Sequence, residues 1–292
     1  MHLRMNTIWV TGSKGQLGTE ISLQKDKLQN VRFLFTDIEE LDLTDELAVL
    51  DFAKKESPDI IINCAGYTAV DKAEEEQDKA FLLNCIVPAY LNKAAELSKG
   101  TMIHISTDYI FDGESKHPYY EDDMPNPQSV YGKSKLAGEK EALKNSNNIV
   151  IRTSWLYSAH GNNFVKTMLR LGKEREEIGV VNDQIGSPTS ATDFADALLQ
   201  VSKQLLGGKK NAGGIYHYSN EGECSWYEFA IAIMKFAKLN CRIKPLTTEQ
   251  YPLPAKRPGN SVFNKSKIKS VFGLEIPKWE DSLERLIPES NN

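Results

Sequence analysis

Short apolar runs alternate with longer amphipathic stretches through about the first 180 residues of the chain. The runs read TIWV at 7–10, VRFLFTD at 31–37, DIIINCAG at 59–66, TMIHISTD at 101–108 and NIVIRTSW at 148–155. Apolar runs separated by amphipathic segments are typical of β-strands joined by crossover helices in a parallel sheet. The pattern therefore predicts an α/β fold with a doubly wound, Rossmann-like parallel sheet.

The amphipathic stretches predict the crossover helices. We expect one from about Leu17, one that opens at Thr44 and stops before Pro58, one over 77–98, and one from about Ser129. Acidic residues follow Thr44, where they favour the positive end of a helix, and a proline cannot continue one. The run at 59–66 is nearly all apolar, as in a central strand that is covered on both faces.

The alternation becomes less regular after about residue 180. Two helices are predicted there, over 192–206 and 225–239, followed by a proline-rich segment over 245–258. Ligands of open α/β sheets bind at the carboxyl edge of the strands. We therefore expect a dinucleotide-binding domain over 1–180 and, over 181–292, mainly a smaller substrate-binding lobe above that edge, with some segments returning to the sheet.

Composition narrows the classes of protein that fit. The chain has 292 residues, of which 40% are hydrophobic and 26% charged, with a formal net charge of -5. No run approaches the ~20 apolar residues of a membrane span. The acidic balance argues against a protein that binds a nucleic-acid backbone. We expect a soluble enzyme-sized α/β protein with no membrane or nucleic-acid partner.

Cysteines and the first residues bear on location. Cys64, Cys85, Cys224 and Cys241 form no C-x-x-C pair, so we expect buried free thiols rather than a zinc site or a disulfide framework. The opening MHLRMNTIWV has no apolar core of signal-peptide length before Gly12. The expected location is the cytoplasm.

A glycine-rich turn follows the first apolar run. Gly12, Gly15 and Gly18 stand three residues apart between the predicted first strand and first helix. In that context glycines let backbone amides approach a pyrophosphate at a helix N-terminus. Asp37 ends the second strand about 20 residues on, where a carboxylate can bind an adenosine ribose. The alternative is a turn whose glycines only pack the helix on the strand.

Tyr131 and Lys135 stand four residues apart in SVYGKSKLAGEK, on one face of a predicted helix. A nearby ammonium stabilises a phenolate and lowers the phenol pKa from about 10 toward the working range, so the tyrosine can protonate a carbonyl oxygen. The pair is also common on plain surface helices. Thr107 and Asp108 end a predicted buried strand at the same edge, where they can hold a substrate oxygen.

Several motifs together identify a family. TGSKGQLG, NCAGYTAVDKAE, STDYIFDG and YGKSKLAGE resemble the extended short-chain dehydrogenase/reductases. RTSWLY, GNNF, NDQIGSPT and RPGNS narrow the resemblance to the dTDP-4-dehydrorhamnose reductase family. The match runs from Thr11 to about Ser261. It implies reduction of the C4 ketone of dTDP-4-dehydro-L-rhamnose, the last step of dTDP-L-rhamnose synthesis.

The resemblance implies roles for particular residues. Tyr131 is implied as proton donor with Lys135 as its modulator, and Thr107, Asp108 and Trp155 as contacts of the sugar. The alternative for Trp155 is a core aromatic, since most tryptophans are largely buried. The implied cofactor contacts are Gly12, Gly15, Gln16, Leu17, Asp37, Asp42, Leu43, Ala65, Gly66 and Tyr67, together with Tyr131 and Lys135.

Arg257, in RPGNS, is predicted from chemistry more than from a motif, because a guanidinium pairs well with the phosphates of a nucleotide diphosphate. For the cofactor, Asp37 repels the 2′-phosphate of NADPH whereas Lys14 can attract it. We expect NADPH and NADH both to serve, NADPH at least as well.

Two alternatives share these motifs. One is a nucleotide-sugar epimerase or dehydratase, which keeps NAD bound and returns the hydride. The other is the non-catalytic regulatory subunit of methionine adenosyltransferase, which shares the fold and much of the tyrosine-lysine motif.

Some members of the family are dimers joined through magnesium held by glutamates. One of these glutamates lies shortly after a P-T pair that is Pro188-Thr189 here, and this chain has Thr192 where we expect the acid. Asp193 comes one position later, about 100° further round a helix, and Asp193 or Glu20 would have to substitute. Magnesium needs several oxygen ligands. We expect no metal requirement, and a monomer or weak homodimer.

Overall fold

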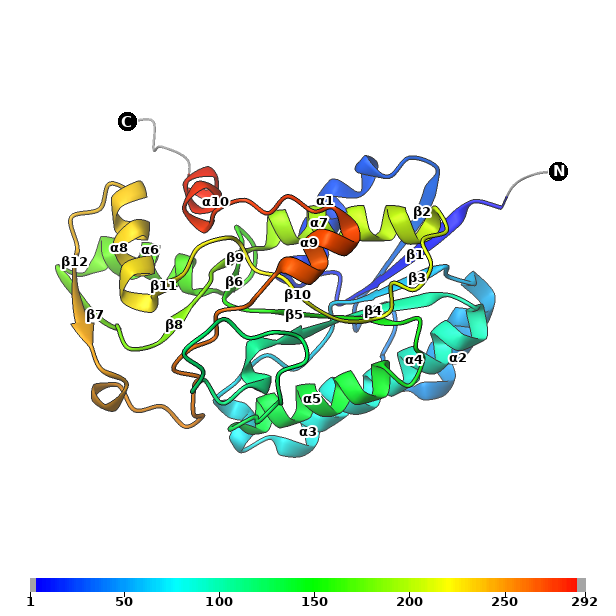
Figure 1. The fold of residues 1–292 in the computed structure, drawn as a ribbon, viewed down its shortest axis with the longest axis horizontal. Coiled ribbons are helices and arrows are strands. Elements are labelled where there is room, and N and C mark those ends of the chain that lie inside the picture. Colours follow the sequence, from blue (N-terminus) through cyan, green and yellow to red (C-terminus); the bar gives the residue numbers. More distant parts are fainter. Residues whose placement is uncertain (1–3, 288–292) are drawn as a thin grey trace.

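A computed structural model of the chain describes residues 4–287 (Figure 1). Its centre is a six-stranded sheet in which every neighbouring pair is parallel. In spatial order the strands are β10 (Gly214–His217), β5 (Ile149–Thr153), β4 (Thr101–Thr107), β3 (Ile60–Asn63), β1 (Asn6–Thr11) and β2 (Val31–Thr36). The doubly wound parallel sheet is confirmed. The strand order reverses at β1, which places a crevice at the carboxyl edge there.

Alternating side chains of the strands pack under two helical layers. Ile60 and Ile62 of β3 belong to the core under α1 (Gln16–Gln24), α7 (Ala191–Leu206) and α9 (Ser266–Phe272). Ile61 belongs to the core on the other face, under α2 (Glu46–Glu56), α4 (Val87–Ser98) and α5 (Val130–Ala142). Both faces of the strand are buried, which explains its continuous apolar sequence.

The helix expected over 77–98 has a break. α3 (Gln77–Phe81) is followed by a π-helical turn over Leu82–Ile86 and then by α4. Pro88 lies in the first turn of α4. Proline lacks the N–H that the helical ladder needs, so a widened turn before it accommodates the missing bond.

A second core lies beyond the carboxyl edge of the sheet. It is built by α6 (Phe164–Glu174), α8 (Trp226–Phe236), α10 (Trp279–Leu286) and the parallel pair β7 (Glu177–Val181) and β12 (Arg242–Leu246). α6, α9 and α10 are absent from the sequence-based expectation. Short strands complete the fold: β6 (Leu156–Tyr157), β8 (Ile185–Gly186), β9 (Thr189–Ser190) and β11 (Cys224–Ser225).

The two cores alternate along the chain. α6 and β7 precede residue 181 and belong to the second core, whereas α7 and β10 follow it and belong with the sheet. The division of function at residue 180 stays a prediction.

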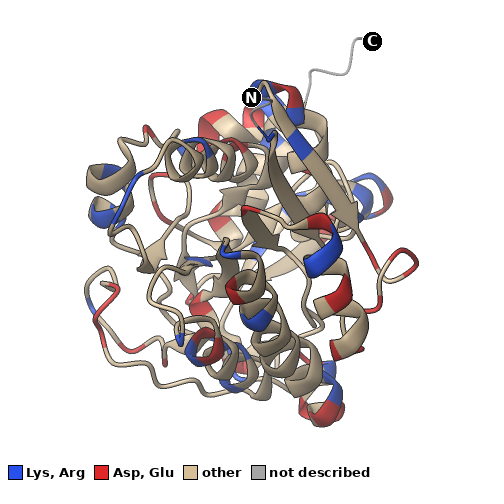
Figure 2. Ribbon diagram, turned by 90° about the vertical axis from the view of Figure 1, so that its right-hand side faces the viewer, with Lys and Arg blue, Asp and Glu red and all other residues tan. Residues whose placement is uncertain are grey.

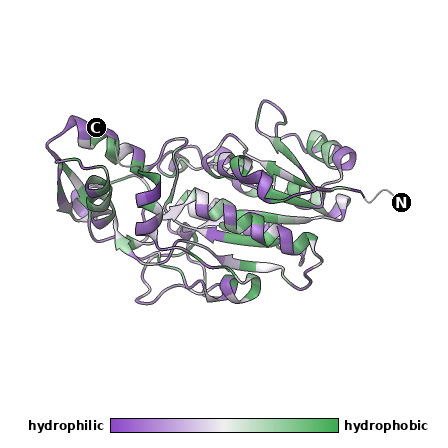
Figure 3. Ribbon diagram, turned by 90° about the horizontal axis from the view of Figure 1, so that it is seen from above, coloured by the Kyte–Doolittle hydropathy of each residue, from purple (hydrophilic) through white to green (hydrophobic). Residues whose placement is uncertain are grey.

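Surface and thiols are consistent with an ordinary globular protein. Basic and acidic residues are interspersed around the sheet (Figure 2), and hydrophobic residues gather along the strands and the inner helix faces (Figure 3). No helix within 4–287 is long and apolar enough to cross a membrane. All four cysteines are free thiols. Cys224 and Cys241 are buried, but Cys64 and Cys85 are only half-buried, because they lie beside the cleft and near the helix surface.

Candidate active site

A cleft of about 1070 Å³ lies at the carboxyl edge of the sheet, where β1, β3, β4 and β5 end. Residues from α1, α5 and α8 complete its walls. Of the residues predicted for the site, these line it: Gly12, Gly15, Gln16, Leu17, Asp37, Asp42, Leu43, Ala65, Gly66, Tyr67, Thr107, Asp108, Tyr131, Lys135 and Trp155. Only Arg257, among the predicted residues, is not part of the lining.

The glycines of the turn differ in what surrounds them. Gly12 has φ +63°, and a Cβ there would lie 2.7 Å from the Ala65 nitrogen. A Cβ on Gly18 would lie 2.4 Å from the Gly12 oxygen. These two glycines are required for packing. A Cβ on Gly15 would meet only the Gly12 oxygen, at 3.2 Å, and Gly15 begins α1 without a side-chain cap. No side chain therefore stands between the first turn of α1 and the cleft.

Acidic groups surround the end of β2. The Asp37 carboxylate accepts hydrogen bonds from the backbone nitrogens of Lys14 and Ile38, both at 2.9 Å. The Lys14 ammonium bonds to Glu39 and lies 3.0 Å from Glu40, and the bond to Glu39 is the main reason that the pKa of Lys14 is raised. The only basic side chain of the turn is thus already paired with acids.

Asp42 forms the adjoining part of the cleft. It accepts bonds from the backbone nitrogen of Thr44 at 2.9 Å and from its hydroxyl at 2.7 Å, and these bonds lower the pKa of the Asp42 carboxyl.

Ser129 caps α5 and so sets the position of Tyr131 and Lys135 on its first turns. The Lys135 ammonium donates to the Ile105 carbonyl at 2.5 Å. Burial lowers the pKa of Lys135 to about 8 and raises the pKa of Tyr131 to about 12. The expectation that Lys135 lowers the pKa of Tyr131 is not met, because desolvation dominates; a hydrogen bond with Thr107 provides the one downward contribution.

Thr107 and Asp108 meet Tyr131 from the end of β4. The Thr107 hydroxyl donates to Asp108 Oδ1 at 2.9 Å and accepts from the Tyr109 backbone nitrogen at 3.3 Å. Burial raises the pKa of Asp108 to about 6. A neutral phenol, a hydroxyl and a carboxyl thus converge at one end of the cleft.

Asn84, in the π-helical turn, is a site residue that the sequence analysis missed. Its side-chain oxygen accepts from the Tyr67 nitrogen at 2.8 Å, and its amide donates to the Tyr67 carbonyl and to Ser134 Oγ, each at 3.0 Å. Asn84 is buried and lines the cleft. A polar residue inside the apolar stretch LLNCIVPAY, four positions before Pro88, was the available signal.

Trp155 stacks on Trp226, which the sequence analysis also missed. The ring centroids are 3.6 Å apart and the planes 9° from parallel, and both rings line the cleft. Trp155 has φ +48°, a strained value for a bulky residue. A Cβ on Gly186 would lie 2.6 Å from the Trp155 ring, so the ring lies flat against a residue without a side chain. The stack joins the end of β5 to the start of α8.

Arg257 is engaged elsewhere. Its guanidinium donates to both carboxylate oxygens of Asp71, at 3.0 and 2.7 Å. Its assignment to the nucleotide diphosphate stays a prediction.

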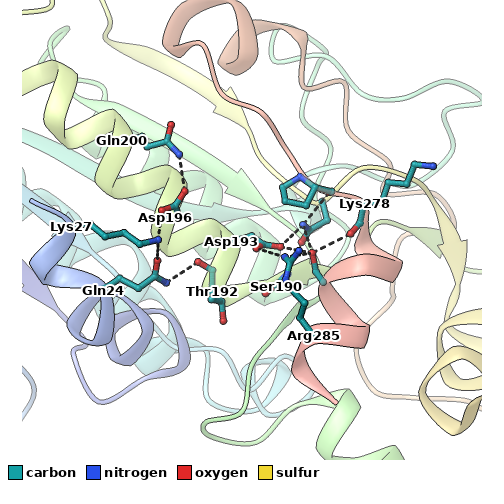
Figure 4. Close-up of polar contacts among 12 residues, drawn as sticks. Gln24, Lys27, Ser190, Thr192, Asp193, Asp196, Gln200, Lys278 and Arg285 are labelled. Carbon is teal, nitrogen blue, oxygen red and sulfur yellow. Dashed lines mark hydrogen bonds and ion pairs between the residues drawn. The ribbon is translucent and has the colours of Figure 1, made fainter. Parts of the chain in front are cut away.

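Asp193 lies in a network between α7 and α10 (Figure 4). Its carboxylate accepts from Asn220 Nδ2 at 2.8 Å, from Arg285 Nη2 at 2.7 Å and from the Ser282 hydroxyl. Glu20 is buried, with His160 Nε2 at 3.7 Å. Residues 4–287 contain no group of three or more acidic, histidine or cysteine side chains placed to hold a metal.

Known proteins match this chain over nearly its whole length. The family model described as the RmlD substrate binding domain matches residues 5–292. A dTDP-4-dehydrorhamnose reductase of Aggregatibacter actinomycetemcomitans is 42% identical over 291 residues, which cover 97% of this chain and 98% of that protein.

Solved structures agree as well. A dTDP-4-dehydrorhamnose reductase of Clostridium acetobutylicum has a TM-score of 0.91 at 44% identity, over 96% of this chain and 98% of that one. One from Bacillus anthracis, in complex with NADP, has a TM-score of 0.90 at 39% identity, over 97% and 99%.

Proposed function

Because this chain belongs to the dTDP-4-dehydrorhamnose reductase family, we propose that the cleft at the carboxyl edge of the sheet holds NAD(P)H and the sugar nucleotide end to end, with Tyr131 as proton donor between them. The chain is an NAD(P)H-dependent oxidoreductase of dTDP-rhamnose biosynthesis, which reduces the C4 ketone of dTDP-4-dehydro-L-rhamnose to give dTDP-L-rhamnose.

The observation that carries the assignment of roles is the shared lining of one cleft. The open first turn of α1, with Gly15, lies at the dinucleotide end, while Tyr131, Lys135 and Thr107 come from α5 and β4. Gly15 fits a pyrophosphate because a side chain there would fill the space that backbone amides offer to it. The Asp37 carboxylate accepts hydrogen bonds from the hydroxyls of the adenosine ribose.

At the reacting end the side chains orient the ketone and move one proton. When bound, the nicotinamide supplies the hydride. Tyr131 donates its phenolic proton to the O4 oxygen, and its raised pKa keeps that proton in place until then. Thr107 binds the same oxygen by turning its hydroxyl proton from Asp108 Oδ1 to the ketone. The Lys135 ammonium, held by the Ile105 carbonyl, stabilises the phenolate that Tyr131 becomes and binds the nicotinamide ribose.

The sugar nucleotide extends from Tyr131 over the aromatic stack toward the second core. Trp155 faces the sugar ring and Trp226 supports it from α8. Asp108 binds a sugar hydroxyl. The Arg257 guanidinium binds the diphosphate and Asp71 at the same time.

NADH and NADPH both serve in this proposal. Asp37, Glu39 and Glu40 oppose a 2′-phosphate, while Lys14 can exchange its acidic partners for it. We place the enzyme in the cytoplasm, where reduced nicotinamide cofactors and nucleotide sugars are available, as a monomer or weak homodimer.

One assay tests the function. The purified protein is given NADPH, or NADH, and then the 4-ketosugar nucleotide made in situ by its upstream enzymes. One NAD(P)H should be oxidised for each sugar reduced. Product formation without net loss of NAD(P)H would instead indicate an epimerase or dehydratase. No reduction, together with capture of a methionine adenosyltransferase, would indicate a regulatory subunit.

A further inference from the structure

A segment between β6 and α6 lies against the first turn of α1. This segment, residues 158–163, includes the start of the GNNF motif, and its Gly161 and Asn162 line the cleft. Gly161 has φ +63°, and a Cβ there would lie 3.2 Å from Cγ of Gln16. His160 Nε2 lies 3.7 Å from Glu20 Oε1, one turn further along α1. The segment thus contacts α1 at two successive turns.

The contact centres on the side-chain oxygen of Gln16. Asn163 Nδ2 donates to Gln16 Oε1 at 2.9 Å, and the Ser158 hydroxyl lies 3.2 Å from the same oxygen. The Ser158 hydroxyl has a single proton and lies 2.9 Å from the His160 carbonyl as well. Asn163 is therefore the constant donor to Gln16.

The network determines which way both amides face. The backbone N–H of Lys166 can only donate, and it bonds to Asn163 Oδ1 at 3.0 Å as the cap of α6. The opposite atom, Nδ2, must then face Gln16, and it also donates to the Ser158 carbonyl at 2.8 Å. Since Nδ2 is a donor, Gln16 must present its oxygen to it. Gln16 lines the cleft, and because its oxygen is bonded to Asn163, its amide nitrogen is the atom that can donate to a ligand there.

We propose that Asn163 is a positioning residue for the cofactor: it holds Gln16 with its Nε2 amide directed at the dinucleotide pyrophosphate, beside the open first turn of α1. An amide donor suits a phosphate, whereas the rotated amide would present an oxygen to it. The inference rests on the proposed binding of NAD(P)H in this cleft.

The arrangement also connects the two cores. Asn163 begins α6, which packs against α8, and α8 carries Trp226 of the aromatic stack. Gln16 belongs to α1 under the sheet. The hydrogen bond between Asn163 and Gln16 thus connects the first turn of α1 with α6 and, through α6, with α8.

Replacement of Asn163 by serine tests the proposal. Serine is a good helix cap, so Asn163→Ser keeps α6 capped, but its short hydroxyl does not reach Gln16. The dissociation constant for NADPH, measured by calorimetry without sugar substrate, should rise about three- to tenfold. Thr167→Ala is the matched control: its hydroxyl bonds to the Asn163 carbonyl at 3.0 Å in the same turn and does not contact Gln16. It should leave NADPH binding unchanged.

A double-mutant cycle separates positioning from general damage. Gln16→Met should weaken NADPH binding by itself, and Asn163→Ser added to it should change binding by less than about twofold. Additive losses would overturn the proposal, because Asn163 would then not act through Gln16. If the serine variant does not fold, Asn163→Asp, which also caps α6 but cannot donate to Gln16, enters the same cycle.

The outcomes distinguish this inference from the function beneath it. If the unaltered protein binds neither NADPH nor NADH, the proposed function fails. If it binds them and the folded Asn163 variant binds equally well, only the positioning role is overturned.

Discussion

Burial acts in opposite directions on the two side chains that we place at the reacting carbonyl. It raises the pKa of Tyr131 and lowers the pKa of Lys135, because both charged forms are disfavoured away from water. Near neutral pH the phenol keeps its proton and Lys135 is mostly an ammonium. These are the states that a proton donor and its electrostatic partner need.

Replacing Tyr131 with phenylalanine removes the proton donor and little else, since the ring remains against Tyr109. We expect kcat to fall by ~10²-fold or more, with the NADPH dissociation constant unchanged. Single-turnover kinetics and calorimetry measure the two quantities. Near-normal turnover would mean that the proton comes from another group.

The pKa of Lys135 predicts how the activity depends on pH. Its pKa of about 8 means that the ammonium loses its proton as the pH rises through that value. The kcat/KM for NADPH, which reports the free enzyme, should therefore decline above about pH 8. The series starts at about pH 7, above the range in which Asp108, with a pKa of about 6, takes up a proton.

Lys135→Arg is the control, because a guanidinium stays charged throughout this range. Its overall activity should be lower, but the decline near pH 8 should disappear. A decline that persists in the arginine variant would assign it to another group.

At the scale of elements, α5 is held to the sheet by a buried ion pair. Glu139 of α5 accepts from Arg152 of β5 through Nε at 3.0 Å and Nη2 at 2.8 Å, and from Ser106 of β4 at 2.5 Å. The exposed fractions of the Arg152 and Glu139 side chains are only 1% and 2%. Glu139 lies one turn beyond Lys135, so the pair also keeps the face of α5 that carries Tyr131 and Lys135 against β4.

Glu139→Gln would leave the Arg152 charge buried without its counterion. We expect the free energy of unfolding to fall by ~3–5 kcal/mol in urea titrations. Glu141→Gln on the same helix is the comparison, since Glu141 pairs at 2.6 Å with the exposed Lys144 and should cost less than ~1 kcal/mol. Equal losses in the two variants would contradict a structural role for the buried pair.

At the scale of the whole molecule, our expectations about a metal and the oligomeric state rest on the surroundings of Asp193. Three donors from outside α7 occupy its carboxylate, and Arg285 contributes a compensating charge (Figure 4). A carboxylate committed in this way is a poor ligand for a shared cation. Thr192, the neighbouring residue, has no carboxylate, and its backbone carbonyl accepts from Gln24 at 2.9 Å.

We therefore expect activity without added magnesium and a monomer or weak dimer in solution. Sedimentation at about micromolar protein, with magnesium and then with EDTA, measures this together with the rate. A stable dimer that dissociates and loses activity on chelation would show that other residues supply the metal site.

Local sequence predicted five of the six strands of the sheet, whereas β10 was not predicted. A strand buried on both faces must be apolar along its length, so β3 and β4 are readable from their own residues. The turn with Gly15 and the spacing of Tyr131 and Lys135 are also local, because three or four residues fix their geometry within one element. The family motifs are short contiguous stretches as well, so the reaction could be predicted from the sequence.

Contacts between distant segments decided the rest. Trp226 meets Trp155 only because α8 returns to the end of β5, and Arg257 pairs with Asp71 across 186 positions. No local pattern encodes such pairs. The α10 helix is short, and the apolar faces of α6 and α10 are explained only by the second core that they share.

The electrostatics of the site belong to the tertiary structure as well. The spacing of Tyr131 and Lys135 suggested an ammonium that lowers the pKa of the phenol, and that expectation omitted desolvation. Desolvation depends on every element that closes over a side chain, so it raised the pKa of Tyr131 and lowered that of Lys135. Sequence predicted many of the groups that line the cleft, though not Asn84 or Trp226, whereas the assembled fold decided which protons they hold.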